Sequence, residues 1–138
     1  YGGGGILKKD LLKENKNKII NIHLGPIPQI RGVNAAEWSL LLNQSSKVTI
    51  HFIDEGIDTG PIINYFNYDR KKCKSIQDLR DAALIAGIKG LLDTLKNKNK
   101  LKNKLFIKSK SEFESRQCFS MTPVIKKYLN TKLSRNLK

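Results

Sequence analysis

An α/β fold with a mostly parallel sheet flanked by helices is predicted by three features of the 138-residue chain. Segments typical of strands and of helices follow one another in an order expected of α/β domains. The strand expected at residues 18–23 is a continuous, β-branched apolar run, as in strands covered on both faces. Polar residues also follow the ends of two expected strands, where open α/β sheets assemble their sites.

The N-terminal residues 1–5 are expected to form a glycine loop, and residues 6–13 a short helical turn. The glycine run is weak evidence for a phosphate-binding loop, because no strand precedes it and the Lys and Ser or Thr of that motif are absent. After the first strand, residues 25–32 contain two prolines and two glycines. This composition predicts a loop whose backbone is partly fixed and partly free to adopt unusual dihedral angles.

A short helix is expected after this loop. Asn34 is its predicted N-cap, with Glu37 three residues on as the partner in a capping box. Val33 is expected to pack against Trp38 across the first turn. Three consecutive leucines complete its buried side: Leu40, Leu41 and Leu42.

Two strands and a long helix are expected next. Residues 48–53 show the alternation of a strand, and residues 61–68 are predicted to form another. Ser75 and Asp78 form a second capping box at the start of the helix. Its apolar side is expected to consist of residues at helical spacing, namely Leu84, Ile88, Leu91, Leu92 and Leu95.

The composition divides the chain into three parts: a main domain at residues 1–95, a Lys/Asn-rich connector at 96–104 and a C-terminal extension at 105–138. The extension is expected to carry a basic amphipathic helix with Thr122 as N-cap and Pro123 as its first residue. The apolar face of this helix is predicted from Val124, Ile125, Tyr128, Leu129 and Leu133.

The formal net charge of +14 comes mostly from the C-terminal part of the chain. Residues 1–95 carry 13 basic and 10 acidic side chains, whereas residues 96–138 carry 13 basic and 2 acidic ones. Of the basic residues, 21 are Lys and 5 are Arg. Because readout of bases and stacking on them favour Arg and interleaved aromatic residues, this distribution favours a solvated connector over a nucleic-acid surface.

Composition and motifs also exclude several classes of protein. With 39% hydrophobic and 28% charged residues, the chain resembles an ordinary soluble protein, and its longest apolar run is too short to span a bilayer. No signal peptide opens it, so a cytoplasmic location without membrane contact is expected. Cys73 and Cys118 lie far apart, and His23 and His51 do not have metal-ligand spacing, which predicts reduced structural thiols and no metal site.

Asn21, His23 and Asp58 are the candidate catalytic residues. Residues two apart on a strand point to the same side, so Asn21 and His23 present a carboxamide and an imidazole together. The amide can donate to a developing oxyanion, the imidazole can exchange protons, and a carboxylate opposite them can raise the proton affinity of the imidazole or hold a water. This set suits acyl transfer by direct attack, because no activated Ser or Cys accompanies it. A structural role for His23 is the alternative, and His51 is expected to be structural or to support the others.

Several motifs together resemble the catalytic domain of the formyltransferases that use 10-formyltetrahydrofolate. They are residues 21–23, Pro28 with Arg31 and Gly32, residues 48–51 and residues 56–60. The resemblance covers Tyr1 to about Leu95. It implies a Rossmann-like domain that transfers a formyl group from this folate co-substrate, without a metal, to an amine.

The resemblance also implies a role for individual residues. Asn21 would stabilise the tetrahedral oxyanion, His23 would act as general acid and base, and Asp58 would tune His23 and order a water. The acceptor side would be formed by Pro28, Arg31 and Gly32. The folate pocket would include Tyr1, Gly2, Ile6, Leu7, Gly56, Ile57 and Thr59.

Three departures from the family pattern bear on the acceptor. The family's catalytic domain has an N-terminal half that this chain lacks, so we expect an incomplete folding unit that is prone to aggregate. The loop after His23 reads Leu-Gly-Pro-Ile-Pro where the enzymes acting on methionyl-tRNA or glycinamide ribonucleotide usually show Ser-Leu-Leu-Pro. Residues after Leu95 are too few for the C-terminal domain of the tRNA enzyme, and residues 117–123 are more similar to enzymes that act on amino sugars.

We therefore expect a formyltransferase acting on an amino sugar or a similar small amine. A fragment of a methionyl-tRNA formyltransferase is the second hypothesis, supported by the charge of the C-terminal part. A non-catalytic basic binding module is the third, and the candidate residues Asn21, His23 and Asp58 argue against it. The identity of the amine and the oligomeric state are not indicated by the sequence.

Overall fold

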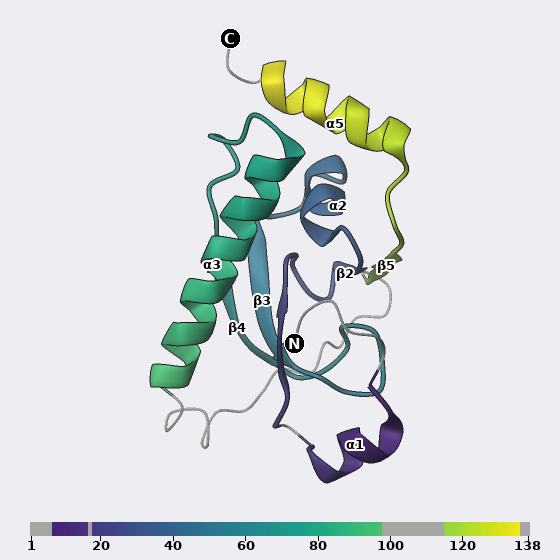
Figure 1. Cartoon of the computed structure of the whole chain (residues 1–138), viewed down its shortest axis with the longest axis vertical. Helices are drawn as coiled ribbons and strands as arrows, with labels where there is room; N and C mark the ends of the chain where they lie inside the picture. Colours follow the sequence, from purple (N-terminus) through teal and green to yellow (C-terminus); the bar gives the residue numbers. More distant parts are fainter. Residues whose placement is uncertain (1–6, 17, 98–114, 136–138) are drawn as a thin grey trace.

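The computed structural model describes residues 7–16, 18–97 and 115–135 (Figure 1). Its elements are α1 (Lys9–Glu14), β1 (Ile20–His23), β2 (Ile30–Gly32), α2 (Ala35–Leu41), β3 (Lys47–Phe52), β4 (Ile62–Asn67), α3 (Ile76–Lys96), β5 (Arg116–Cys118) and α5 (Pro123–Arg135). The α/β class is confirmed. The glycine loop predicted at residues 1–5 and most of the predicted connector lie outside the described residues.

The larger sheet has the strand order β1-β3-β4, and both of its strand pairs are antiparallel. The prediction of a mostly parallel sheet is therefore wrong for the residues that the structure describes, among which only the small β2-β5 pair is parallel. An apolar run covered on both faces does not reveal the direction of its neighbours. Between β3 and β4 the chain has only the loop at residues 53–61, which is too short for the crossover that parallel strands require.

Helix α3 lies along this sheet (Figure 1) and packs against it through small residues. Its buried positions include Ala83, Gly87, Gly90 and Thr94. A Cβ added at Gly87 would lie 2.5 Å from Cγ2 of Ile22, and one added at Gly90 would lie 2.4 Å from Cδ2 of Phe66. The helix backbone therefore approaches the strands more closely than large side chains would permit.

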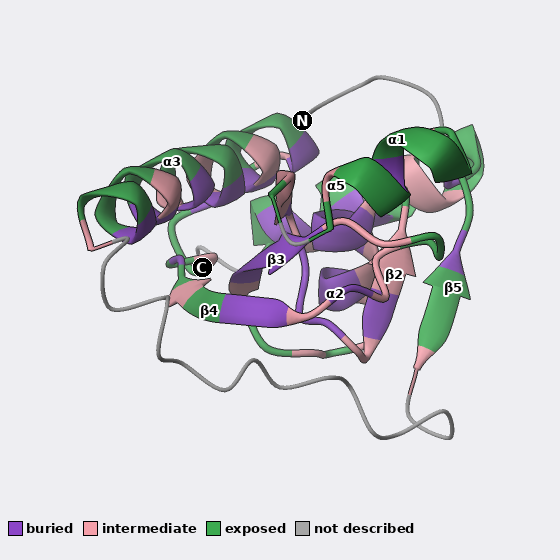
Figure 2. Ribbon diagram, turned by 90° about the horizontal axis from the view of Figure 1, so that it is seen from below, coloured by how far each residue is buried: buried purple, intermediate pink, exposed green. Residues whose placement is uncertain are grey.

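The large apolar residues of α3 form one side of the helix as predicted, but most of that side is not buried. Leu84, Ile88, Leu92 and Leu95, together with Ile85, are 46–53% exposed. Only Leu91 of the predicted set packs against a core cluster. Figure 2 shows residues coloured as exposed along the side of α3 that faces away from β3 and β4. The expectation that the chain aggregates stays a prediction.

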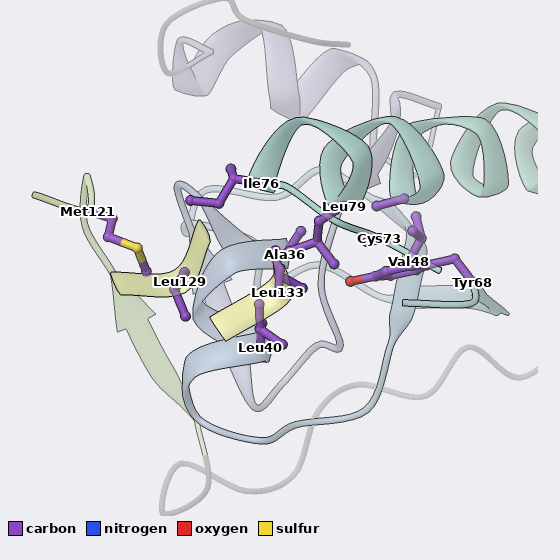
Figure 3. Packing of buried hydrophobic residues seen from close by; sticks show 11 residues of the cluster. Ala36, Leu40, Val48, Tyr68, Cys73, Ile76, Leu79, Met121, Leu129 and Leu133 are labelled. Atoms are coloured by element: carbon purple, nitrogen blue, oxygen red, sulfur yellow. The ribbon is translucent and has the colours of Figure 1, made fainter. Parts of the chain in front are cut away.

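The main core lies where α2, α3 and α5 meet β3 (Figure 3). It includes Leu40, Val48, Leu79, Leu129 and Leu133. Of the face predicted for α5, Leu129 is buried, whereas Val124 and Tyr128 are exposed. The first residue of α5 is Pro123, as predicted.

Asn34 is the N-cap residue of α2, as predicted, but the predicted capping box is absent there, whereas the capping box predicted for α3 is confirmed. Asn34 adopts a left-handed conformation with a φ of 55° and makes no side-chain cap bond. Its side chain is used elsewhere: Nδ2 donates to Oε1 of Glu37 at 3.1 Å, and Oδ1 accepts from the amide of Met121 at 2.9 Å. Val33 is 54% exposed. In α3, Ser75 and Asp78 form the reciprocal capping box.

Cys73 and Cys118 are free and buried, as the sequence predicts. Among the described residues, no helix is long and apolar enough to cross a membrane. The same part of the chain contains no group of three or more side chains that could hold a metal ion.

Candidate functional site

The candidate site lies where β1, β3 and the loop at residues 53–61 meet. The register places Asn21 of β1 opposite His51 of β3, so their side chains share one side of the sheet. The loop then folds back toward β1, and Asp58 has a left-handed backbone with a φ of 52°. A Cβ at Gly60 would lie 1.9 Å from the carbonyl oxygen of Phe52, so the return of the loop requires glycine there.

Hydrogen bonds within the loop hold it closed. The amide of Phe52 donates to the carbonyl of Pro61 at 2.9 Å. The hydroxyl of Thr59 and the amide of Gly56 both donate to Oδ1 of Asp54, at 2.6 and 3.1 Å. Bonds on both sides of Asp58 therefore brace the loop that carries it.

The structure brings Asn21, His23 and Asp58 together and adds His51 to the group. Nδ2 of Asn21 lies 3.2 Å from Nε2 of His51 and 3.4 Å from Oδ1 of Asp58. Nδ1 of His23 lies 3.2 Å from Oδ2 of Asp58, and Nε2 of His51 lies 3.5 Å from its Oδ1. The amide of Gly32 donates to Oδ2 at 2.8 Å. Both carboxylate oxygens of Asp58 are thus held by neighbours on β1, β2 and β3.

The bonding partners indicate where the protons lie. Nε2 of His23 is 2.9 Å from the carbonyl of Ile30, which requires a proton on that nitrogen. With only that proton, Nδ1 carries a lone pair that faces the carboxylate of Asp58. A hydrogen bond between Nδ1 and the carboxylate therefore requires one further proton. The His23–Asp58 pair is therefore built to hold one exchangeable proton. His51 donates from Nδ1 to the carbonyl of Phe52 at 2.8 Å, and its Nε2 faces Nδ2 of Asn21, which is a donor.

Burial and charge act in opposite directions on this pair. Burial lowers the pKa of His23 below its ordinary value of 6.5, although the charge of Asp58 and the carbonyl of Ile30 oppose the shift. Burial alone would raise the pKa of Asp58, but His51, His23 and the Gly32 amide outweigh it and lower that pKa below 3.8. Near neutral pH, Asp58 therefore stays ionised.

We expect stability to fall as the pH drops below 6.5. Because the pKa of His23 is lower in the folded state, the unfolded chain takes up that proton first, and protonation favours unfolding. The stabilisation from ionised Asp58 is complete above pH 3.8 and is lost as the pH falls through its lowered pKa. Urea unfolding measured from pH 8 to about pH 5 tests the first effect. A His23→Gln variant should show a flatter profile in this range, and an unchanged slope would contradict the assignment.

Two pockets meet at these residues. The first, which we call the apolar pocket, has a volume of about 410 Å³, and its apolar lining residues include Leu7, Val33, Ile53, Ile57 and Phe119. The second, the polar pocket, measures about 590 Å³, and its polar lining residues include Glu37, Gln77, Arg80 and Asp81. Residues common to both are Asn21, Gly32, Val33 and Asp58. Molecules bound in the two pockets would therefore meet at the amide of Asn21 and the carboxylate of Asp58.

The residues predicted for the folate pocket, together with Gly32, occupy different positions in the structure. Leu7, Gly56 and Ile57 line the apolar pocket, and Gly32 lines both pockets. Thr59 braces the loop through Asp54. Tyr1, Gly2 and Ile6 lie outside the described residues.

Two residues predicted for the acceptor side, Arg31 and Pro28, do not line either pocket. Arg31 donates from Nε to the hydroxyl of Ser115 at 2.6 Å and from a terminal nitrogen to the carbonyl of Ile57 at 3.0 Å. Its guanidinium therefore joins segments of the protein. Pro28 is absent from the lining of both pockets.

Sequence reasoning underrated His51 and missed the residues contributed by β5. His51 lines the apolar pocket beside Asn21, and antiparallel pairing of β1 with β3 is the signal that would have placed it there. Gln117 and Cys118 of β5 line the same pocket, and so does Phe119, which directly follows the strand. β5 is only three residues long, so no periodic pattern marks it.

Comparisons with known proteins agree on one family. A family model described as "Formyl transferase" matches residues 2–95. A methionyl-tRNA formyltransferase from Bacillus subtilis is 32% identical over 95 residues, which are 68% of this chain and 30% of the relative. The chain thus spans less than a third of that relative.

Solved structures of formyltransferases have the same fold. One from Anoxybacillus kamchatkensis, in complex with UDP-4,6-dideoxy-4-formamido-L-AltNAc and tetrahydrofolate, has a TM-score of 0.70 at 23% identity, covering 83% of this chain and 59% of that one. An N-formyltransferase from Helicobacter canadensis, in complex with folinic acid and dTDP-3-aminofucose, has a TM-score of 0.65 at 26% identity. The match covers 83% of this chain and 41% of that one.

Proposed function

Because the chain belongs to the formyl transferase family, we propose that it transfers a formyl group from 10-formyltetrahydrofolate to a primary amine of a small acceptor such as an amino sugar. The observation that carries this proposal is the position of Asn21 and Asp58 at the junction of two pockets. A transferase that joins two substrates directly needs such a junction, because the reacting atoms must approach each other from two binding sites.

We place the folate co-substrate in the apolar pocket and the amine in the polar pocket. The flat rings of a folate suit the apolar side chains of the first pocket. The second pocket offers the hydrogen-bonding groups of Gln77, Arg80 and Asp81, which suit the hydroxyl and amine groups of a sugar.

The proposed reaction begins when the amine nitrogen attacks the formyl carbon. The carbonyl oxygen becomes an oxyanion, which an N–H of Asn21 stabilises. Both N–H bonds of this amide now face protein acceptors, and the longer contact, 3.4 Å to Asp58, is the one that the substrate oxygen would replace. The amine proton passes to the His23–Asp58 pair. When the bond between the formyl carbon and N10 breaks, N10 receives a proton, giving tetrahydrofolate and the formamide.

Direct attack of the amine on the formyl carbon, with no covalent intermediate on the protein, agrees with the properties of the thiol in the apolar pocket. Cys118 lines the apolar pocket, but burial raises the pKa of its thiol. A protonated thiol is a poor nucleophile, so Cys118 is a poor candidate for a formyl-enzyme intermediate.

Transfer can be tested by adding 10-formyltetrahydrofolate and measuring the tetrahydrofolate released with dTDP-3-aminofucose, glycinamide ribonucleotide or methionyl-tRNA as acceptor. We expect turnover with the amino sugar. Turnover with methionyl-tRNA alone would favour the second hypothesis, which the Bacillus subtilis relative keeps open. Folate binding without turnover on any acceptor would contradict the proposal.

Replacing the connector lysines separates the first two hypotheses. The replaced residues would be Lys96, Lys98, Lys100, Lys102 and Lys104, each changed to Gln. Transfer to a small amine should be unaffected. If tRNA is the acceptor, affinity should fall and the salt dependence of binding should decrease by about one slope unit for each lost phosphate contact.

A further inference from the structure

The segment at residues 115–121, which contains β5, lies outside the region matched by the family model yet forms one wall of the apolar pocket. β5 pairs in parallel with β2, more than eighty residues earlier in the chain. The amide of Arg116 donates to the carbonyl of Gln29, and the amide of Val33 donates to the carbonyl of Cys118, both at 3.1 Å. This pairing fixes the β5 segment directly beside the amide of Gly32, which holds Asp58.

Side chains anchor the same segment. The indole nitrogen of Trp38 donates to the carbonyl of Phe119 at 2.8 Å. The amide of Met121 donates to the side chain of Asn34, and the hydroxyl of Ser115 accepts from Arg31. The backbone is therefore held on both sides of Phe119.

Close packing makes the contact between β2 and β5 specific. Gly32 has a φ of 92°, and a Cβ at this position would lie 2.2 Å from the carbonyl oxygen of Cys118. Only glycine allows β5 to approach β2 this closely while the Gly32 amide still points at Asp58. The β5 segment is thus packed into the site by several independent contacts.

The side chain of Phe119 is unusual in this setting. Its backbone is anchored, but 69% of the residue is exposed, and it lines the apolar pocket. The loop that carries Ile57 and Asp58 lines the same pocket. An exposed aromatic ring on a fixed backbone can pack against a flat ligand with little loss of backbone freedom.

We propose that Phe119 binds the folate co-substrate by packing its side chain against a flat ring of that molecule. The nearby side chain of Gln117 would then face the polar edge of the same folate ring. This inference rests on the proposed function. It extends the co-substrate site beyond residues 2–95 to the C-terminal part of the chain.

Binding of folinic acid to the chain, measured by calorimetry, tests the assignment. Phe119→Ala should weaken binding by about tenfold, because an aromatic contact and its buried area are lost. Phe119→Tyr keeps the ring and should bind within about twofold of the parent. Tyr128→Ala is the matched control, since Tyr128 is an exposed aromatic residue on α5 that does not line either pocket.

Each outcome bears on the proposal. Equal affinity of the parent and Phe119→Ala would overturn the role of Phe119 and leave the proposed function intact. Equal losses in Phe119→Ala and Tyr128→Ala would also overturn it, because the effect would not be local. No binding by the parent would overturn both proposals. If Phe119→Ala does not fold, Phe119→Leu replaces it, and affinity equal to that of the parent would again contradict ring packing.

Discussion

Replacing Asp58 by Asn is expected to lower the rate of formyl transfer by about 100- to 10,000-fold, the range found for losing a general acid or base. The substitution keeps the shape of the side chain but removes the charge that faces His23 at 3.2 Å. The pair can then no longer hold the proton released by the amine. His23 should also become harder to protonate, so the acid limb of the pH–rate profile should move to lower pH if His23 acts as the free base.

Two neighbouring substitutions show whether the groups act together. His23→Ala removes the other half of the proton-holding pair and should cost about as much as Asp58→Asn. Asn21→Ala removes the oxyanion donor and should lower turnover by about 100- to 1,000-fold. Affinity for folinic acid should change much less than turnover, because these groups act on the tetrahedral state.

Single-turnover rates with the proposed amine measure these effects. Asp93→Asn is the control, because Asp93 is an exposed carboxylate on α3 that lines neither pocket. A rate for His23→Ala or Asp58→Asn within a few-fold of the parent would contradict the proposed mechanism.

The parts of the site that could be predicted from sequence are those with local signals. Asn21 and His23 share a face because they are two residues apart on β1, and the motif around Asp58 marked the loop after β3. His51 was underrated because its place beside Asn21 depends on antiparallel pairing, which an apolar run does not reveal. The wall formed by β5 depends on a pair of three-residue strands far apart in the chain.

Residue size explains why the side of α3 that packs on the sheet is not the predicted apolar side. Large apolar residues at helical spacing predicted the apolar side of α3, but the sheet packs against Gly87 and Gly90, where it can approach the backbone. At α2, Asn34 is the N-cap residue as predicted, but its side chain bonds to the side chain of Glu37 and to the amide of Met121 and makes no capping bond. The partner at Met121 is far away in the sequence and leaves no mark near Asn34, so this contact could not be predicted from local propensity.

Replacing Arg80 by Ala is expected to destabilise the fold by about 3 kcal/mol, because it leaves a buried carboxylate without its cation. Glu37 is only 2% exposed, and its Oε1 accepts from Nε of Arg80 at 2.7 Å and from Asn34 at 3.1 Å. A surface ion pair would contribute much less, about 0–1 kcal/mol. The difference arises because burial prevents water from solvating the carboxylate that remains.

A double-mutant cycle with Glu37→Gln and Arg80→Ala, followed by urea unfolding, measures the coupling of this pair. The double variant should be more stable than the sum of the single effects implies, since the neutral carboxamide introduced by Glu37→Gln needs no cation. Arg135→Ala, at the exposed end of α5, is the matched control and should change stability by less than about 0.5 kcal/mol. Additive losses of stability would contradict the coupling of the buried pair.

Because Glu37 and Arg80 both line the polar pocket, the single Arg80→Ala variant should also raise KM for the amine acceptor more than it lowers kcat.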